Sequence, residues 1–135
     1  MSRTDVFIDT NVLVYLSDTD LSKARRSAEI LAAGGVVSVQ VLNEFILVAR
    51  RKMLKPWPDV RAMLAAIRPD LLVVPVTEDI HQRGLLYSER YGFRIFDSML
   101  LAAAVLASCS TFFSQDLNDG QVIDGLTIRN PYAGP

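Results

Sequence analysis

The chain has 135 residues, 50% of them hydrophobic and 21% charged, so it is typical of a globular protein with a hydrophobic core and not of a disordered one. Its formal net charge of −1 gives no sign of a generally basic surface, so any nucleic-acid-binding surface has to be local. A single cysteine, Cys109, and a single histidine, His81, exclude an intramolecular disulfide, a cysteine-built zinc site and a two-histidine metal site within the chain.

The first predicted strand lies in the stretch DVFIDTNVLVYL, where the apolar run Val6–Ile8 directly precedes Asp9. A run of β-branched and aromatic residues is typical of a short strand buried on both faces. Parallel α/β sheets bind ligands outside the carboxyl ends of their strands, which is where this carboxylate would lie. Taken alone, Asp9 is more simply the cap of a helix predicted at residues 12–16, because Asp is common at that position. Whether Asp9 is only a helix cap or part of a ligand site depends on whether other acids of the chain lie near it.

The rest of the chain alternates between helical and extended patterns. Helices are predicted at residues 21–33, 40–53, 59–67, 78–91 and 96–108, and strands at residues 36–39, 71–74 and 111–113. Residues 121–123 and 126–128 are expected to form a final hairpin or edge strand. Strands that alternate with helices predict one α/β domain over residues 1–135, with a short, mainly parallel central sheet flanked by helices.

Two of the predicted helices carry an acid on their apolar side. Glu44 has Val41 three residues before it and Val48 four residues after it, and Asp97 heads the apolar face of its helix in the same way. A buried carboxylate without a partner is costly, and an arginine, a proton or a metal ion has to offset that cost. The simpler alternatives are a glutamate that reaches out to water and an aspartate that begins a helix.

The fourth acid, Asp116, follows the predicted strand 111–113 in a loop whose Ser, Asn, Asp and Gly residues are also typical of an ordinary turn. The four acids share a pattern, because two follow strands and two lie on the buried sides of helices. Carboxylates gathered in one crevice repel each other and raise each other's pKa. A divalent cation relieves this repulsion, and ligation by oxygen alone suits Mg²⁺ or Mn²⁺ rather than zinc.

The segments around these acids resemble the PIN-domain ribonucleases. The similarity lies in IDTNVLVYL around Asp9, SVQVLNEF up to Glu44, FDSMLLAAA around Asp97 and FFSQDLNDG around Asp116, and it covers nearly the whole chain. A PIN domain of this length without an appended domain is similar to the VapC-type toxins of prokaryotic toxin–antitoxin pairs. The resemblance therefore implies a single PIN-like nuclease domain.

The resemblance also implies a function and a set of residues. It implies an endoribonuclease that depends on Mg²⁺, for which Mn²⁺ can substitute, and that is the toxin of a type II toxin–antitoxin system. Its catalytic residues would be Asp9, Glu44, Asp97 and Asp116, with the metal on Asp9, Asp97 and Asp116, and with Asn11 and Ser114 in support. Many relatives carry a further acid two residues after the last of these, but this chain has Asn118 there, so Asp119 is a secondary candidate.

The expected chemistry is hydrolysis of RNA by metal-activated water, because no nucleophile with an adjacent base is evident. RNA needs a positive approach surface, and the basic residues Arg50, Arg51, Lys52 and Lys55 are the candidates. An equally good explanation of that cluster is the helix dipole, which favours cations at a helix C-terminus. Apolar residues in segments 12–16 and 21–33 are expected to contribute to a homodimer contact or to a groove for an antitoxin helix.

Other interpretations have less support. An aspartyl phosphotransferase would usually have a second Asp where this chain has Asn11, and His81 lies in a polar helix that solvent is expected to surround. Cys109 is most simply a small buried apolar residue. The alternative from another class is a catalytically silent PIN fold kept as a protein-binding or scaffold module. The sequence shows no secretory signal and no apolar run long enough to cross a bilayer, so a cytoplasmic setting without membrane association is expected.

Overall fold

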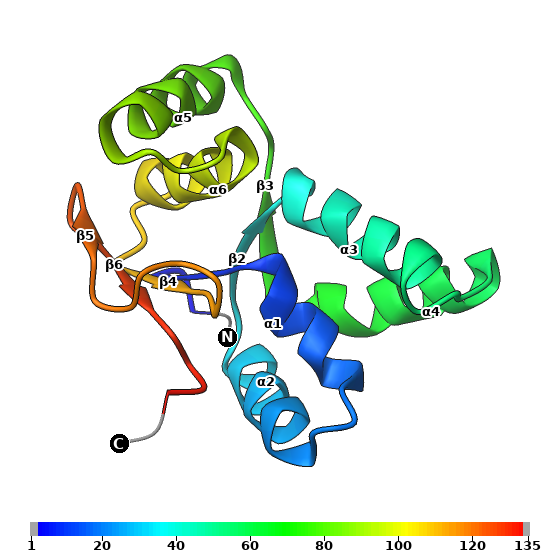
Figure 1. Ribbon diagram of the computed structural model, residues 1–135. Helices are drawn as coiled ribbons and strands as arrows, with labels where there is room; N and C mark the ends of the chain where they lie inside the picture. The colour runs from blue at the N-terminus through cyan, green and yellow to red at the C-terminus, as the bar shows by residue number, and fades with distance from the viewer. Residues whose placement is uncertain (1–2, 134–135) are drawn as a thin grey trace.

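A computed structural model of the protein describes residues 3–133. Within these residues, six strands form one sheet in the order β3-β2-β1-β4-β6-β5 (Figure 1). All neighbouring strands are parallel except β5 and β6, which form an antiparallel hairpin at one edge. The predicted α/β class with a mainly parallel sheet is therefore confirmed. The strands are β1 (Val6–Ile8), β2 (Gly35–Ser38), β3 (Leu71–Val74), β4 (Thr111–Phe113), β5 (Val122–Ile123) and β6 (Leu126–Arg129).

Helices lie around this sheet. Figure 1 shows α5 and α6 as a pair above the sheet, α2 below it, and α3 and α4 as a second pair to the right. Short 3-10 helices follow α1 and α4 at Tyr15–Ser17 and Arg68–Asp70. The α-helices of the described residues are α1 (Thr10–Val14), α2 (Leu21–Ala33), α3 (Val39–Arg51), α4 (Trp57–Ile67), α5 (Glu78–Tyr91) and α6 (Ile95–Leu106).

Local signals in the sequence set several of these helix ends. The side chain of Asp20 accepts hydrogen bonds from the backbone N–H groups of Ser22 and Lys23, and α2 begins there. Thr77 caps α5 in the same way, and Gly92 ends it in a left-handed conformation with φ of 77°. The observed bounds of α2 and α5 therefore coincide with the predicted ones.

The strand β1 is the centre of the core. All three of its residues are buried, and the ring of Phe7 stacks on Phe112 of β4 with centroids 5.3 Å apart. The backbone N–H of Asp9 donates to the carbonyl of Phe113, so the parallel pairing of β1 and β4 continues to the carboxyl edge. This register brings Asp9 to the middle of that edge and close to the loop that follows β4.

Close packing of α5 against α6 fixes the start of α6. A Cβ atom on Gly84 of α5 would lie 2.9 Å from the sulfur of Met99 and 3.3 Å from its backbone nitrogen. One turn along α5, the hydroxyl of Ser88 donates to that of Ser98, which is fully buried. The residue before Ser98 is Asp97, so this packing determines where the first turn of α6 presents its acid.

The structure differs from the sequence-based expectation in the first helix and in its apolar surface. The helix expected at residues 12–16 begins earlier, as α1, and continues as the 3-10 turn Tyr15–Ser17. Val12, Leu13 and Ile30 are almost fully buried, so the core covers most of the apolar surface that we expected to be free there, although Leu21 is 72% exposed. No helix in residues 3–133 is long and apolar enough to span a membrane.

Candidate active site

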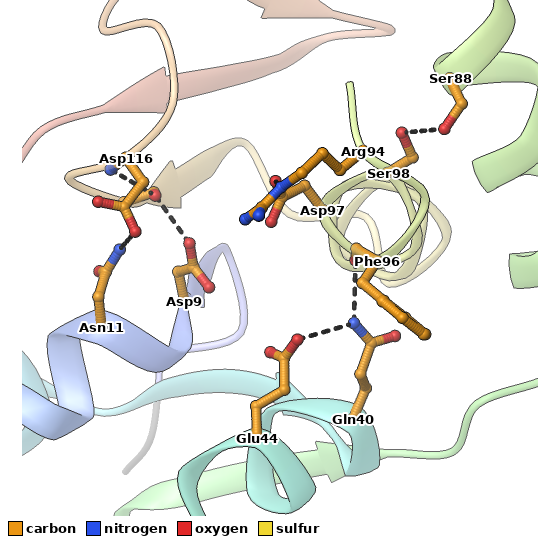
Figure 2. Close-up of polar contacts among 11 residues, drawn as sticks. Asp9, Asn11, Gln40, Glu44, Ser88, Arg94, Phe96, Asp97, Ser98 and Asp116 are labelled. Carbon is orange, nitrogen blue, oxygen red and sulfur yellow. Dashed lines mark hydrogen bonds and ion pairs between the residues drawn. The ribbon is translucent and has the colours of Figure 1, made fainter. Parts of the chain in front are cut away.

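A cavity of about 540 Å³ opens at the carboxyl edge of the sheet. All four predicted acids line it, and each comes from a different part of the chain: the end of β1, α3, the first turn of α6 and the loop after β4. Figure 2 shows their side chains around a common space. The lining residues are Asp9, Thr10, Asn11, Val14, Tyr15, Glu44, Leu47, Val48, Lys52, Arg94, Asp97 and Asp116.

Asp9 is the most buried of the four acids, with 7% of its surface exposed. Its Oδ1 accepts a hydrogen bond of 2.7 Å from the backbone N–H of Thr10, and its Oδ2 accepts one of 2.7 Å from the Ser114 hydroxyl. The pKa of Asp9 is raised from 3.8 to about 7, mainly by burial and to a smaller extent by the charges of Asp97 and Glu44, while the two hydrogen bonds act in the opposite direction. Asp9 is thus both the cap of α1 and a member of the acidic cavity.

Glu44 is held by two polar side chains that the sequence did not identify. The Thr10 hydroxyl donates to its Oε2 at 2.7 Å, and the Gln40 amide nitrogen lies 3.4 Å from its Oε1. The same Gln40 nitrogen donates to the carbonyl of Phe96 at 2.9 Å, which connects α3 to the start of α6. Gln40 lies one helical turn before Glu44, and that spacing is the signal that could have identified it.

Asp116 contacts both residues predicted to support the site, and one of them, Ser114, connects it to Asp9. The Asn11 amide donates to Asp116 Oδ2 at 2.9 Å, and the Asp116 backbone N–H donates to the Ser114 hydroxyl at 3.2 Å. Ser114 is fully buried and its hydroxyl donates to Asp9, so one hydroxyl contacts both acidic segments. The remaining side-chain oxygen of Asn11 is buried and has no hydrogen-bond partner.

Of the four acids, Asp97 forms an ion pair, with a residue that the sequence did not single out. The Nε of Arg94 lies 3.3 Å from Asp97 Oδ2, with 88% of the arginine side chain and 24% of the aspartate side chain exposed. In Figure 2 the guanidinium extends over Asp97 toward the space between the acids. The spacing of three residues in the first turn of a helix is the sequence signal for this pair.

The other predicted residues lie in different surroundings. Of the basic cluster, Lys52 lines the cavity, whereas Arg50 donates to the Lys55 carbonyl and its guanidinium lies over the Trp57 ring. Arg51 is exposed on the last turn of α3. The Asp119 carboxylate accepts the backbone N–H of Asn130 at 2.9 Å and does not line the cavity.

The donor atoms of the cavity suit a hard divalent cation. Carboxylate oxygens are the ligand type that Mg²⁺ and Mn²⁺ prefer. In residues 3–133, no three acidic, histidine or cysteine side chains stand together closely enough to hold an ion directly. Mg²⁺ commonly keeps several of its waters and uses only one or two protein carboxylates, so this looser arrangement fits such an ion.

A parallel α/β sheet with acids gathered at its carboxyl edge defines a class of protein that binds its ligand at that edge. The PIN domain family model matches residues 6–119, and the chain belongs to this family, as its sequence predicted. No curated protein matches the chain.

Three solved structures of similar fold are one toxin and two toxin–antitoxin complexes. A toxin–antitoxin complex from Klebsiella pneumoniae has a TM-score of 0.72 at 21% identity, over 94% of this chain and 98% of that one. VapC20 of Mycobacterium tuberculosis, a toxin that cleaves the sarcin–ricin loop, has a TM-score of 0.66 at 20% identity, over 82% of this chain and 91% of that one. VapBC2 from Rickettsia felis, bound to promoter DNA, has a TM-score of 0.68 at 15% identity, over 93% of this chain and 97% of that one. At these identities the similarity shows the fold.

Proposed function

We propose that this PIN domain is a Mg²⁺- or Mn²⁺-dependent endoribonuclease and the toxin of a type II toxin–antitoxin system. The observation that carries the proposal is the meeting of four carboxylates, from segments far apart in the sequence, around one cavity. Folding brings these like charges together against their mutual repulsion, which a function that needs a cation explains. The similarity of the fold to VapC20, which cleaves the sarcin–ricin loop, supports the same class of activity.

In this proposal Asp9, Asp97 and Asp116 would hold the ion, in part through its bound waters, and the ion would supply activated water and neutralise charge on the phosphate. Ser114 and Asn11 orient Asp9 and Asp116 through the hydrogen bonds described above. Glu44, held by the Thr10 hydroxyl, would orient the attacking water. Lys52 at the cavity provides positive charge for the RNA backbone. The other members of the basic cluster are further candidates for RNA contacts.

We also propose two protein partners. An antitoxin would cover the apolar part of the cavity wall, where Leu47 is 48% exposed, and the toxin–antitoxin complexes of similar fold support such a partner. A second copy of the chain would cover the exposed side chains of Val39 and Phe96, which lie at the joined starts of α3 and α6. The resulting homodimer would lie beside the acidic cavity.

The test is cleavage of RNA by the purified protein with Mn²⁺ and with EDTA. We expect EDTA to abolish cleavage, and we expect Asp9→Asn and Asp97→Asn to do the same while circular dichroism shows an unchanged fold. Asp79→Asn is the matched control, because this exposed acid lies on α5 away from the cavity. Cleavage that persists in EDTA or in both site variants would contradict the acidic site. A folded wild type without any cleavage would favour the silent scaffold instead.

A further inference from the structure

Arg94 is the one arginine among residues 3–133 that lines the acidic cavity, and it stands at an unfavourable position for a cation. It occupies the N-cap of α6, where Ser, Thr, Asp or Asn stabilise a helix by accepting a backbone hydrogen bond. The Arg94 side chain makes no such bond. Its positive charge also opposes the helix dipole, which favours anions at this end. Stability of α6 therefore does not explain the presence of an arginine here.

The ion pair that Arg94 forms with Asp97 is weak. Its Nε lies 3.3 Å from Asp97 Oδ2, and 88% of its side chain is exposed. Ion pairs between exposed side chains are worth about 0–1 kcal/mol, so the guanidinium can leave Asp97 at little cost. Figure 2 shows it reaching over Asp97 into the space that the other acids face. Arg94 is thus an exchangeable cation beside a proposed metal ligand.

We propose that Arg94 competes with the divalent ion for Asp97 and, once displaced, binds a phosphate of the RNA substrate. This inference rests on the proposed nuclease function. Guanidinium groups bind phosphate oxygens through paired N–H donors, and the released side chain stays at the mouth of the same cavity. A phosphate that holds Arg94 away from Asp97 raises the affinity of the site for the ion. By linkage, the bound ion raises the affinity for the phosphate by the same factor. Metal and RNA therefore bind cooperatively, and the RNA-free protein holds its metal weakly.

The first measurement is Mn²⁺ binding by titration calorimetry in the absence of RNA. Arg94→Ala should bind Mn²⁺ about five-fold more tightly than the wild type, which corresponds to removal of a pair worth about 1 kcal/mol. Arg94→Lys keeps the charge and should stay close to the wild type. Arg90→Ala is the matched control, because this exposed arginine lies over the Tyr91 ring on α5 and does not line the cavity. Equal Mn²⁺ affinity in the wild type and Arg94→Ala, or no binding by either, would overturn the competition.

The second measurement is RNA cleavage under saturating Mn²⁺. Arg94→Ala should raise KM for RNA about ten-fold with a smaller change in kcat, as expected for loss of a charge-assisted phosphate contact. Arg94→Lys should have a KM between those of the wild type and Arg94→Ala. An unchanged KM would overturn the phosphate contact. If the wild type binds Mn²⁺ more weakly than Arg94→Ala but cleaves no RNA, the proposed function fails while the competition for Asp97 is supported.

Discussion

Replacement of Asp9 by Asn should stabilise the metal-free protein at pH 8 but not at pH 5. Burial raises the pKa of Asp9 from 3.8 to about 7, so between these values the folded protein binds a proton that the unfolded chain has released. Above pH 7 the carboxylate is ionised in both states, and its burial opposes folding by about 4 kcal/mol, at 1.36 kcal/mol per pH unit. As the pH falls through 7 this penalty shrinks, to about 1.5 kcal/mol at pH 5.

The asparagine keeps one oxygen for the Thr10 N–H but cannot accept from Ser114 as the carboxylate does, which costs about 1–2 kcal/mol. The net gain is therefore about 2–3 kcal/mol at pH 8 and close to zero at pH 5. Urea unfolding in EDTA at the two pH values measures both numbers. The exposed control Glu29→Gln on α2 should change stability by less than about 0.5 kcal/mol at either pH. If Asp9→Asn changed the free energy of unfolding by the same amount at pH 5 and pH 8, the reasoning would be refuted.

Three further predictions concern the metal, the helix packing and the dimer. Mn²⁺ should raise the melting temperature of the wild type by mass action and that of Asp116→Asn much less, and equal shifts in thermal melts would exclude Asp116 from the metal site. Gly84→Val should lower the free energy of unfolding, measured in urea, by about 2–3 kcal/mol, because the valine side chain would collide with Met99. An unchanged free energy of unfolding would mean that α5 can move away from α6 without cost. Phe96→Glu should shift the protein from dimer to monomer in sedimentation without unfolding it. A wild type that sediments only as a monomer at high concentration would contradict the dimer itself.

The sequence predicted most of the fold because its signals are local. The bounds of β1, β3, β4, α2 and α5 coincide with the predicted ones, since apolar runs and capping residues mark them. The strand order could not be read from those signals, because it depends on contacts between distant segments. For the same reason the hairpin β5–β6 was expected only as an edge element, without its pairing to β4.

The acids of the site were visible in the sequence, whereas their contacts were not. Glu44 and Asp97 could be singled out because an acid on an apolar helix face needs a partner. The partners themselves, Thr10, Gln40 and Arg94, are ordinary polar residues at turn and helix positions, where many such residues contact only solvent. Their roles depend on side-chain geometry that spacing within one helix does not define.

The position of β1 in the sheet has a consequence for how the protein is made. The strand β1 is synthesised before its neighbour β4, which comes more than 100 residues later, and the bond between Ser114 and Asp9 spans 105 positions. On the ribosome, β1 therefore has no partner on that side until β4 has been synthesised. In the proposed function, the acidic cavity forms only after β4 and Asp116 have joined the fold, so a nascent chain that lacks them would not cut RNA.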